Sequence, residues 1–385
     1  MDFNFTEEQG MLRDSVARLI REKYDFETRV KVARSAEGWR PELWAQFAEL
    51  GLFHAPFSEE DGGLGGGPID AMIVMEEFGK GLVVEPYIPS VVCGGGLLKH
   101  GATAAQKEEY LASMMEGEKI FAFAGSEPRS AYNFAHVETT ATAEGDGYKL
   151  SGRKSVVVGA PFATHLLVTA RTAGGVHDKD GVSVFIVDKN ADGVTTRDYP
   201  LADGQRASEV LLDNVSVGSD ALIGEKDAGY ALVSRMADEA IGALCAEAVG
   251  GMRVMLDTTV EYAKTRKQFG VPIGSFQALQ HVMADMFIAT EQSVSMTYMV
   301  NVKVDSEEEA VRQLAASAAK VKIGQAGRDV AQRAVQVHGG MGMTDELSIG
   351  HFFKRIETIN TQFGDVDCHL DRFIRLNGGS AQAAE

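Results

Sequence analysis

The hydrophobic period of the chain changes twice, and this pattern limits the fold to three consecutive regions. Residues 3–119 have a helical period, residues 120–224 form short β-branched runs between turn residues, and the helical period returns from residue 230. The segment from Tyr230 to Arg266 alone can form about ten turns of unbroken helix. The sequence therefore predicts a mainly α protein with an N-terminal helical domain (1–119), a central β domain (120–225) and a C-terminal bundle of long antiparallel helices (226–385).

Local signals mark some of the expected helix ends. Thr6 with Gln9, and Thr103 with Gln106, have the spacing of capping boxes, in which each side chain bonds the backbone N–H of the other residue. The stretch PELWAQFAELG (41–51) has proline in its first turn and glycine after its last, the usual asymmetry of a helix. These signals predict helices that begin shortly after the two threonines.

Charge and composition exclude several classes of protein. The net charge is −18, whereas a nucleic-acid phosphate backbone requires a basic surface, so no nucleic-acid partner is expected. No apolar run approaches the roughly 20 residues of a membrane span, so no membrane insertion is expected. The first residues are acidic and helix-like, unlike a secretory signal. The three cysteines are widely spaced, which favours reduced thiols in the cytoplasm.

Several familiar site motifs are missing from the sequence. The stretch GGLGGG (62–67) follows no strand and lacks the GxGxxG spacing of a dinucleotide-binding loop. The nine histidines form no HExxH motif and no cluster with metal-ligand spacing, so no metal site is predicted. No GxSxG nucleophile elbow occurs. The sequence thus indicates no hydrolase, kinase or metalloenzyme.

Three stretches, in their order along the chain, resemble the acyl-CoA dehydrogenase family. They are APFSEEDGGLGGGPIDAMIVMEEFGKG (55–81), RKQFGVPIGSFQALQ (266–280) and QVHGGMGM (336–343), and the β region between the first two opens with FAFAGSEP (121–128). The resemblance covers nearly the whole chain. It implies an N-terminal helical domain, a middle β-barrel domain and a C-terminal four-helix bundle, assembled as a tetramer with FAD between the middle and C-terminal domains.

The resemblance also implies the reaction. Such an enzyme removes two hydrogens from Cα and Cβ of an acyl-CoA to give the trans-2-enoyl-CoA, as in β-oxidation of lipids or steroids. A carboxylate takes the α-proton while FAD accepts the β-hydrogen as hydride, and an electron-accepting flavoprotein reoxidises the cofactor. Both groups must be held on opposite faces of one C–C bond.

A set of C-terminal residues is implied to bind the dinucleotide part of FAD: Arg266, Phe269, Gln277, Gln336, Gly339 and Gly340. The guanidinium of Arg266 would pair with the pyrophosphate across a dimer, since its geometry matches phosphate oxygens. Glycines would let the backbone approach the dinucleotide. The alternatives are a solvated arginine at a helix end, and a helix C-cap at the two glycines.

A second set belongs to the β domain. Phe123, Gly125 and Ser126 match the strand that in this family usually places main-chain and hydroxyl groups against the flavin ring. The tryptophan and threonine that the family places beside the flavin fall here on Val156 and Val158. These five residues are expected to contact FAD.

The catalytic base is where this chain departs from the family. The usual glutamate of the C-terminal loop falls on Phe363, the alternative position on the long helix falls on Ala240, and the CoA-side arginine beside it is Ile241. None of these side chains can abstract a proton. Two carboxylates remain as candidates: Asp365 on the same loop, and Glu247, two helical turns beyond Ala240 and roughly 10 Å away. Their ordinary alternatives are a solvated turn acid and a buried, satisfied glutamate.

The stretches GRKSVVVGAP, LCAEAVG and QFGDVDCHLDRF resemble the small (β-type) subunits of two-gene heteromeric acyl-CoA dehydrogenases that act on steroid-like or dicarboxylic chains. The resemblance favours a subunit that completes a shared FAD site in a heterotetramer with a second, homologous subunit, without supplying the base. Two alternatives stay open. One is a self-sufficient homo-oligomer with a displaced base such as Asp365, and the other is a non-catalytic flavin-binding relative or an oxidase.

Overall fold

The computed structural model describes residues 5–378, which form two compact units. The first, called the helical unit below, joins the described residues up to Val32 with Pro68–Val83 and with the described residues from Ile241 onward. The second, called the sheet unit, joins Ala33–Gly67 with Val84–Ala240. Each unit combines segments that are far apart in the sequence, so the N-terminal helices are divided between them.

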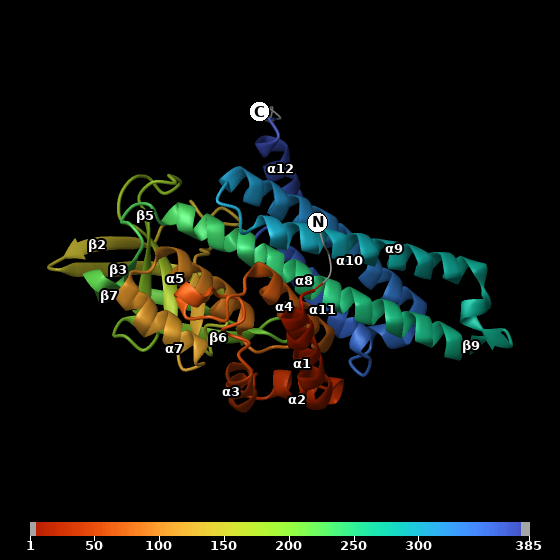
Figure 1. Ribbon diagram of the computed structural model, residues 1–385. Coiled ribbons are helices and arrows are strands. Elements are labelled where there is room, and N and C mark those ends of the chain that lie inside the picture. Colours follow the sequence, from red (N-terminus) through yellow and green to blue (C-terminus); the bar gives the residue numbers. More distant parts are fainter. Residues whose placement is uncertain (1–4, 379–385) are drawn as a thin grey trace. The chain divides into compact units, whose positions relative to one another are not determined.

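Long helices dominate the helical unit (Figure 1). α10 contacts α9, α11 and α12. Asn301 on α9 donates a hydrogen bond from Nδ2 to the carbonyl of Gly242 on α8, at 3.2 Å, and a Cβ on Gly242 would lie 2.6 Å from Oδ1 of Asn301. A larger residue at position 242 would therefore displace the Asn301 side chain where these two helices meet. The helices of this unit, two of which also reach into the sheet unit, are α1 (Glu7–Lys23), α2 (Phe26–Arg34), α4 (Pro68–Gly81), α8 (Gly229–Thr265), α9 (Gln277–Lys303), α10 (Glu309–His338), α11 (Ser348–Thr361) and α12 (Val366–Leu376).

The length of these helices does not make them membrane spans. Among residues 5–378, no helix combines the length and the apolar character that crossing a membrane requires. α10, for example, buries the charged side chains of Arg312 and Lys320 among its alanines. The long helices pack against one another instead.

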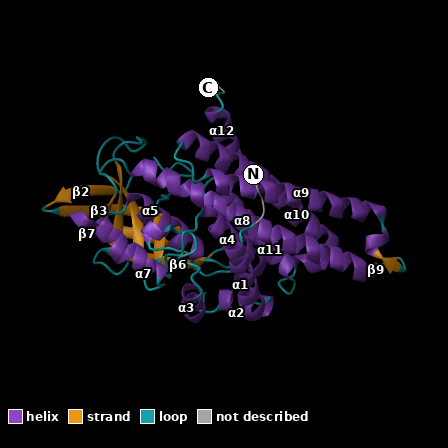
Figure 2. Ribbon diagram, viewed as in Figure 1, coloured by secondary structure: helices purple, strands orange, loops and turns teal. Residues whose placement is uncertain are grey.

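One sheet forms the centre of the sheet unit (Figure 2). Its strand order is β6-β7-β3-β2-β4-β5-β8, with β1 paired to β4. The β1–β4 and β2–β4 pairs are parallel and the others antiparallel. Buried apolar side chains such as Leu150, Leu166, Phe185 and Val210 form its core. The strands are β1 (Phe121–Ala124), β2 (Thr140–Glu144), β3 (Gly147–Val158), β4 (His165–Arg171), β5 (Val182–Asp188), β6 (Val194–Pro200), β7 (Arg206–Gly218) and β8 (Leu222–Ile223).

Short helices complete the sheet unit. They are α3 (Pro41–Glu49), α5 (Gly95–Gly101), α6 (Ala104–Gln106) and α7 (Ala112–Met115), with π-helical turns at Ile88–Gly94 and Lys107–Leu111. Both expected capping boxes are present, because Thr6 and Thr103 bond reciprocally with the residues three positions later. The order of helices, sheet and helices confirms the predicted fold class.

Candidate active site

The loop that follows β1 carries the first group of predicted cofactor residues. β1 pairs with β4, with Phe123 opposite Leu167, and Gly125 and Ser126 follow directly. A Cβ on Gly125 would collide with Cζ of Phe123, so the aromatic ring occupies the space that any other residue would need. The carbonyl of Ser126 accepts a hydrogen bond from the backbone N–H of Ser155 at 2.9 Å. This bond ties the loop to β3.

Val156 and Val158 lie on β3 next to that bond. The pairing of β3 with β7 shifts register between Lys154 and Val157, and Val156 has a φ of 52° and a side chain 53% exposed. This conformation is unfavourable for a β-branched residue. Val158 is half-buried. The structure thus brings the predicted residues of β3 beside the loop of Ser126.

Glu209 on β7 holds the irregular segment of β3. Its carboxylate accepts hydrogen bonds from Oγ of Ser155 at 2.9 Å, the hydroxyl of Tyr199 at 3.1 Å and the guanidinium of Arg153 at 2.8 Å. Burial alone would raise the pKa of Glu209, but these donors outweigh it and lower the pKa. An ionised Glu209 therefore keeps the strand in its irregular shape.

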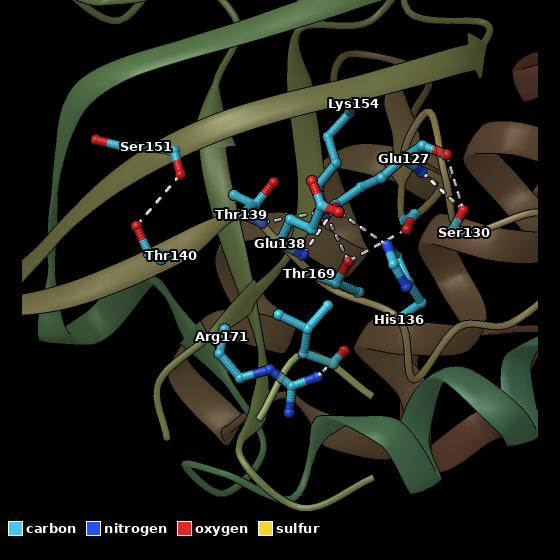
Figure 3. A network of polar contacts seen from close by, with 12 residues as sticks. Glu127, Ser130, His136, Glu138, Thr139, Thr140, Ser151, Lys154, Thr169 and Arg171 are labelled. Atoms are coloured by element: carbon cyan, nitrogen blue, oxygen red, sulfur yellow. Dashed lines mark hydrogen bonds and ion pairs between the residues drawn. The ribbon is translucent and has the colours of Figure 1, made fainter. Parts of the chain in front are cut away.

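A buried ion pair lies beneath the same loop (Figure 3). The Lys154 ammonium donates to Oε1 of Glu127 at 2.7 Å and to Oγ1 of Thr169 at 3.0 Å. The Glu127 carboxylate also accepts the backbone N–H groups of Glu138 and Thr139, at 2.6 and 3.0 Å. Burial lowers the pKa of Lys154 to about 8, against the opposing effect of Glu127. This network fixes Glu127, which directly follows Ser126.

The predicted C-terminal cofactor residues begin where α8 ends. Arg266 is exposed and precedes a hairpin of β9 (Lys267–Gln268) and β10 (Val271–Pro272). At its turn Phe269 has a φ of 53° and is 93% exposed, and its ring lies edge-on to Phe276, with centroids 6.1 Å apart. Gln277, the first residue of α9, is also exposed. Arg266, Phe269 and Gln277 therefore lie around one helix–hairpin–helix junction.

The glycine pair at the end of α10 lies near this junction. The ring of His338, which precedes Gly339, lies 4.4 Å from that of Tyr262 on α8, four residues before Arg266. The N–H of Gly339 donates to the carbonyl of Gln336, and a Cβ on Gly339 or Gly340 would meet no atom within 4 Å. Burial lowers the pKa of His338. Its buried Nε2 makes no hydrogen bond within residues 5–378.

These features fit a dinucleotide phosphate. The exposed guanidinium of Arg266 can form a bidentate contact with two phosphate oxygens. The unhindered backbone at Gly339 and Gly340 allows a close approach. Because Nδ1 of His338 donates to the carbonyl of Ala334 at 2.8 Å, Nε2 of the neutral ring can accept a hydrogen bond from a hydroxyl group of the dinucleotide.

Hydrogen bonds to backbone carbonyls fix the loop on which the family's usual base is expected. Phe363 has a φ of 57°, and its carbonyl lies 2.9 Å from Nε2 of His369, which donates to it. The buried ammonium of Lys320 donates to the carbonyls of Ile359 and of Gln362, the latter at 2.8 Å. Burial lowers the pKa of Lys320 to about 8 and that of His369 to about 3. The conformation of the loop therefore depends on buried side chains of α10 and α12.

Asp365 has a clear structural role. It is the N-cap of α12, and its Oδ1 accepts the backbone N–H of Cys368 at 2.9 Å. The residue also lines an open cavity of about 470 Å³, together with Asn360, Asp367 and Arg328. Asp365 is thus both bound to α12 and accessible from outside the loop.

The other candidate carboxylate is buried. Glu247 on α8 is 3% exposed and forms a two-point ion pair with Arg355 on α11, at 2.5 and 2.6 Å. Ala240 and Ile241, which the resemblance predicts at the family's alternative base and arginine positions, are 0% and 1% exposed. Neither presents a polar group. Glu247 has the satisfied, buried environment of a structural residue.

Comparison with known proteins identifies the family. Family models of the acyl-CoA dehydrogenase N-terminal, middle and C-terminal domains match residues 6–118, 122–215 and 227–375. A 3-(aryl)acrylate reductase of Clostridium sporogenes is 32% identical over 92% of this chain and 94% of its own. The chain belongs to the acyl-CoA dehydrogenase family.

Solved structures of acyl-CoA dehydrogenase relatives agree with this fold. PigA with FAD and proline superposes with a TM-score of 0.91 and 27% identity, covering 98% of this chain and 100% of that one. A variant of the Tcur3481-Tcur3483 steroid ACAD superposes with a TM-score of 0.87 and 27% identity, covering 97% and 98%. The protein is an acyl-CoA dehydrogenase-type flavoenzyme, and its cofactor is FAD.

The residues that hold the site of this acyl-CoA dehydrogenase-type flavoenzyme from beneath are not evident from its sequence. The Glu127–Lys154 pair and the contact of Tyr262 with His338 each join positions far apart in the chain. A charged residue next to an apolar run, such as Lys154 in KSVVVG, is the one signal that could have indicated a buried partner.

Proposed function

We propose that this chain is one subunit of a heteromeric acyl-CoA dehydrogenase, which completes the FAD site but supplies no catalytic base. One feature of the sequence carries the proposal: by the resemblance, the family's two base positions fall on Phe363 and Ala240, and neither side chain can accept a proton. The two candidate carboxylates support it, because Glu247 is paired with Arg355 and Asp365 caps α12. A homologous subunit would supply the base.

The residues of this chain would then hold the cofactor. Arg266, Gly339 and Gly340 would bind the pyrophosphate region, with Phe269, Gln277 and Gln336 around it. Phe123, Gly125, Ser126, Val156 and Val158 would form the wall beside the ring system. Bound FAD would supply hydride acceptance from Cβ of the acyl group.

The substrate we propose is a bulky or dicarboxylic acyl-CoA, in cytoplasmic lipid or steroid degradation. The likeness to a steroid ACAD supports a bulky chain. Valines at positions 156 and 158, in place of a tryptophan and a threonine, remove volume and polarity beside the expected flavin position. An electron-accepting flavoprotein would reoxidise the enzyme after each turnover.

A self-sufficient homo-oligomer is the second candidate, favoured by the position of Asp365 beside an open cavity. Expressing the chain alone separates the two. The heteromer proposal expects no turnover of acyl-CoA thioesters with an artificial electron acceptor, and activity after addition of the homologous partner. Full turnover by the chain alone, at one FAD per chain, would establish the homo-oligomer.

A further inference from the structure

Three potential metal ligands lie together in the loop between β1 and β2. Carboxylate oxygens of Glu127 and Glu138 and a ring nitrogen of His136 all lie within 4.8 Å of one another. Glu127 follows β1 while the other two precede β2, so the loop folds back to bring them together (Figure 3). The sequence does not indicate this cluster, because residues 128–135 separate Glu127 from His136.

His136 supplies the central observation. It is 7% exposed, and its buried Nε2 makes no hydrogen bond within the described residues, although Oε1 of Glu138 lies 3.3 Å away. Buried polar atoms normally have a partner. Two ligands of a tetrahedral zinc ion, each about 2.0–2.2 Å from the metal, stand roughly 3.4 Å apart. The separation of Nε2 and Oε1 matches that expected for two atoms that share one cation.

The surroundings of His136 fix its orientation. Its Nδ1 lies 3.2 Å from Nδ1 of His177, which leaves Nε2 facing the carboxylates. Histidines that bind metals typically make such a hydrogen bond through their other ring nitrogen. Nη2 of Arg171 donates to the carbonyls of Ala135 and Val176, at 2.7 and 2.9 Å. One guanidinium thus holds the residues that precede both histidines.

Glu127 can still accept a ligand. Its Oε1 accepts Lys154 and the N–H of Thr139, and its Oε2 accepts the N–H of Glu138. An ionised carboxylate offers about four lone pairs, so one position remains. Burial would raise the pKa of Glu127, but Lys154 and the hydrogen-bond donors outweigh it and lower the pKa. With Lys154 balancing Glu127, the charge of Glu138 leaves the cluster net negative.

We propose that Glu127, His136 and Glu138 bind a divalent transition-metal ion, which fastens the β1–β2 loop to the sheet. One imidazole and two carboxylates form a donor set that suits zinc, whereas magnesium and calcium prefer oxygen ligands alone. Water would complete the coordination. The role is structural, because the ion links the two ends of the loop.

Titration calorimetry of the full chain tests the site. After dialysis against a chelator and then buffer, Zn²⁺ should bind saturably at one ion per chain, and Mg²⁺ should bind far more weakly. Glu138→Gln should weaken zinc binding at least about tenfold, because it removes a ligand. Its side chain is 49% exposed, so the fold should be preserved. His136→Gln should weaken binding at least as much.

Matched controls make the result decisive. Glu144→Gln changes another exposed acid, on β2, and His281→Gln changes an exposed histidine on α9. Both should bind zinc as the unmodified chain does. The proposal is overturned if no saturable one-to-one binding is seen, if Glu138→Gln binds zinc normally, or if both controls lose affinity equally. Should His136→Gln not fold, the comparison of Glu138→Gln with Glu144→Gln decides alone.

Discussion

Glu247 and Arg355 form a two-point ion pair inside the helical unit, in which Nε and Nη2 of the arginine lie 2.5 and 2.6 Å from the two carboxylate oxygens. The pair joins α8 to α11, and both side chains are at most 5% exposed. Both oxygens of the Glu247 carboxylate are therefore already occupied by Arg355. The pair therefore stabilises the helical unit.

The first prediction concerns the stability of this pair. Glu247→Gln should lower the free energy of unfolding by about 3–5 kcal/mol, because it leaves the Arg355 charge buried without compensation. Glu357→Gln breaks the more exposed pair with Arg328 and should cost only about 0–1 kcal/mol. Denaturant unfolding of both variants measures the difference. Equal losses would mean that the buried pair has no special role.

The second prediction concerns FAD binding. Arg266→Ala should give folded protein with about tenfold to a hundredfold weaker affinity for FAD, the effect of losing a charge-assisted hydrogen bond of roughly 1.5–3 kcal/mol. Lys267→Ala removes the neighbouring exposed charge and should retain the cofactor. Flavin absorbance after extensive dialysis reports both. Full absorbance in Arg266→Ala would remove this arginine from the site.

The third prediction separates the two functions considered for Asp365. Asparagine caps helices about as well as aspartate, so Asp365→Asn removes the charge and keeps the cap of α12. The heteromer proposal expects unchanged turnover in the reconstituted complex. If Asp365 were the base, turnover would fall by about 10²–10⁴-fold with FAD content intact. Flavin content must be measured alongside the rate, since loss of cofactor would imitate loss of the base.

The fourth prediction concerns pH. Burial lowers the pKa of His369 to about 3, whereas the unfolded chain titrates near 6.5, so the unfolded state binds more protons between these values. The contribution of His369 to the free energy of unfolding is fully present above pH 6.5. It decreases as the pH falls toward 3, by up to about 1.4 kcal/mol per pH unit. His369→Gln should flatten the fall between pH 6.5 and 4. An unchanged slope would contradict the assignment.

The fifth prediction concerns assembly. Phe287 and Ile288 on α9 are 55% and 52% exposed, and Phe287 lines an open groove of about 480 Å³ with Leu256 and Val260 of α8. Such a surface favours contact with another subunit. Phe287→Glu should lower the mass measured by light scattering, while Leu211→Glu, at an exposed apolar position of β7, should not. Equal masses for the unmodified chain and both variants would exclude this face of α8 and α9 from the subunit interface.

The fold was predictable because it depends on local signals. The capping boxes at Thr6 and Thr103 and the unbroken helical period before Arg266 act over a few residues, and each is present in the structure. The position of Lys154 beside an apolar run does not identify Glu127 as its partner, because the two residues meet only when β1 and β3 are assembled.

The candidate site shows the same limit. Arg266 and Gly339 are predictions from short motifs, whereas the contact of Tyr262 with His338, close to both, joins two helices far apart in sequence. The capping role of Asp365 was also missed, because an acid after a glycine is typical of a turn as well as of a helix start. Side-chain roles of this kind depend on tertiary contacts, so they cannot be inferred from the local sequence.

The backbone of Val156 has a consequence for selection. A β-branched residue with a φ of 52° costs about 1–3 kcal/mol that glycine or asparagine would avoid. A library randomised at this position and sorted for thermal resistance alone should therefore enrich those two residues. Sorting the same library for flavin retention and turnover should instead enrich branched apolar side chains. In that selection the exposed side chain of residue 156, and not the backbone strain, determines which variants survive.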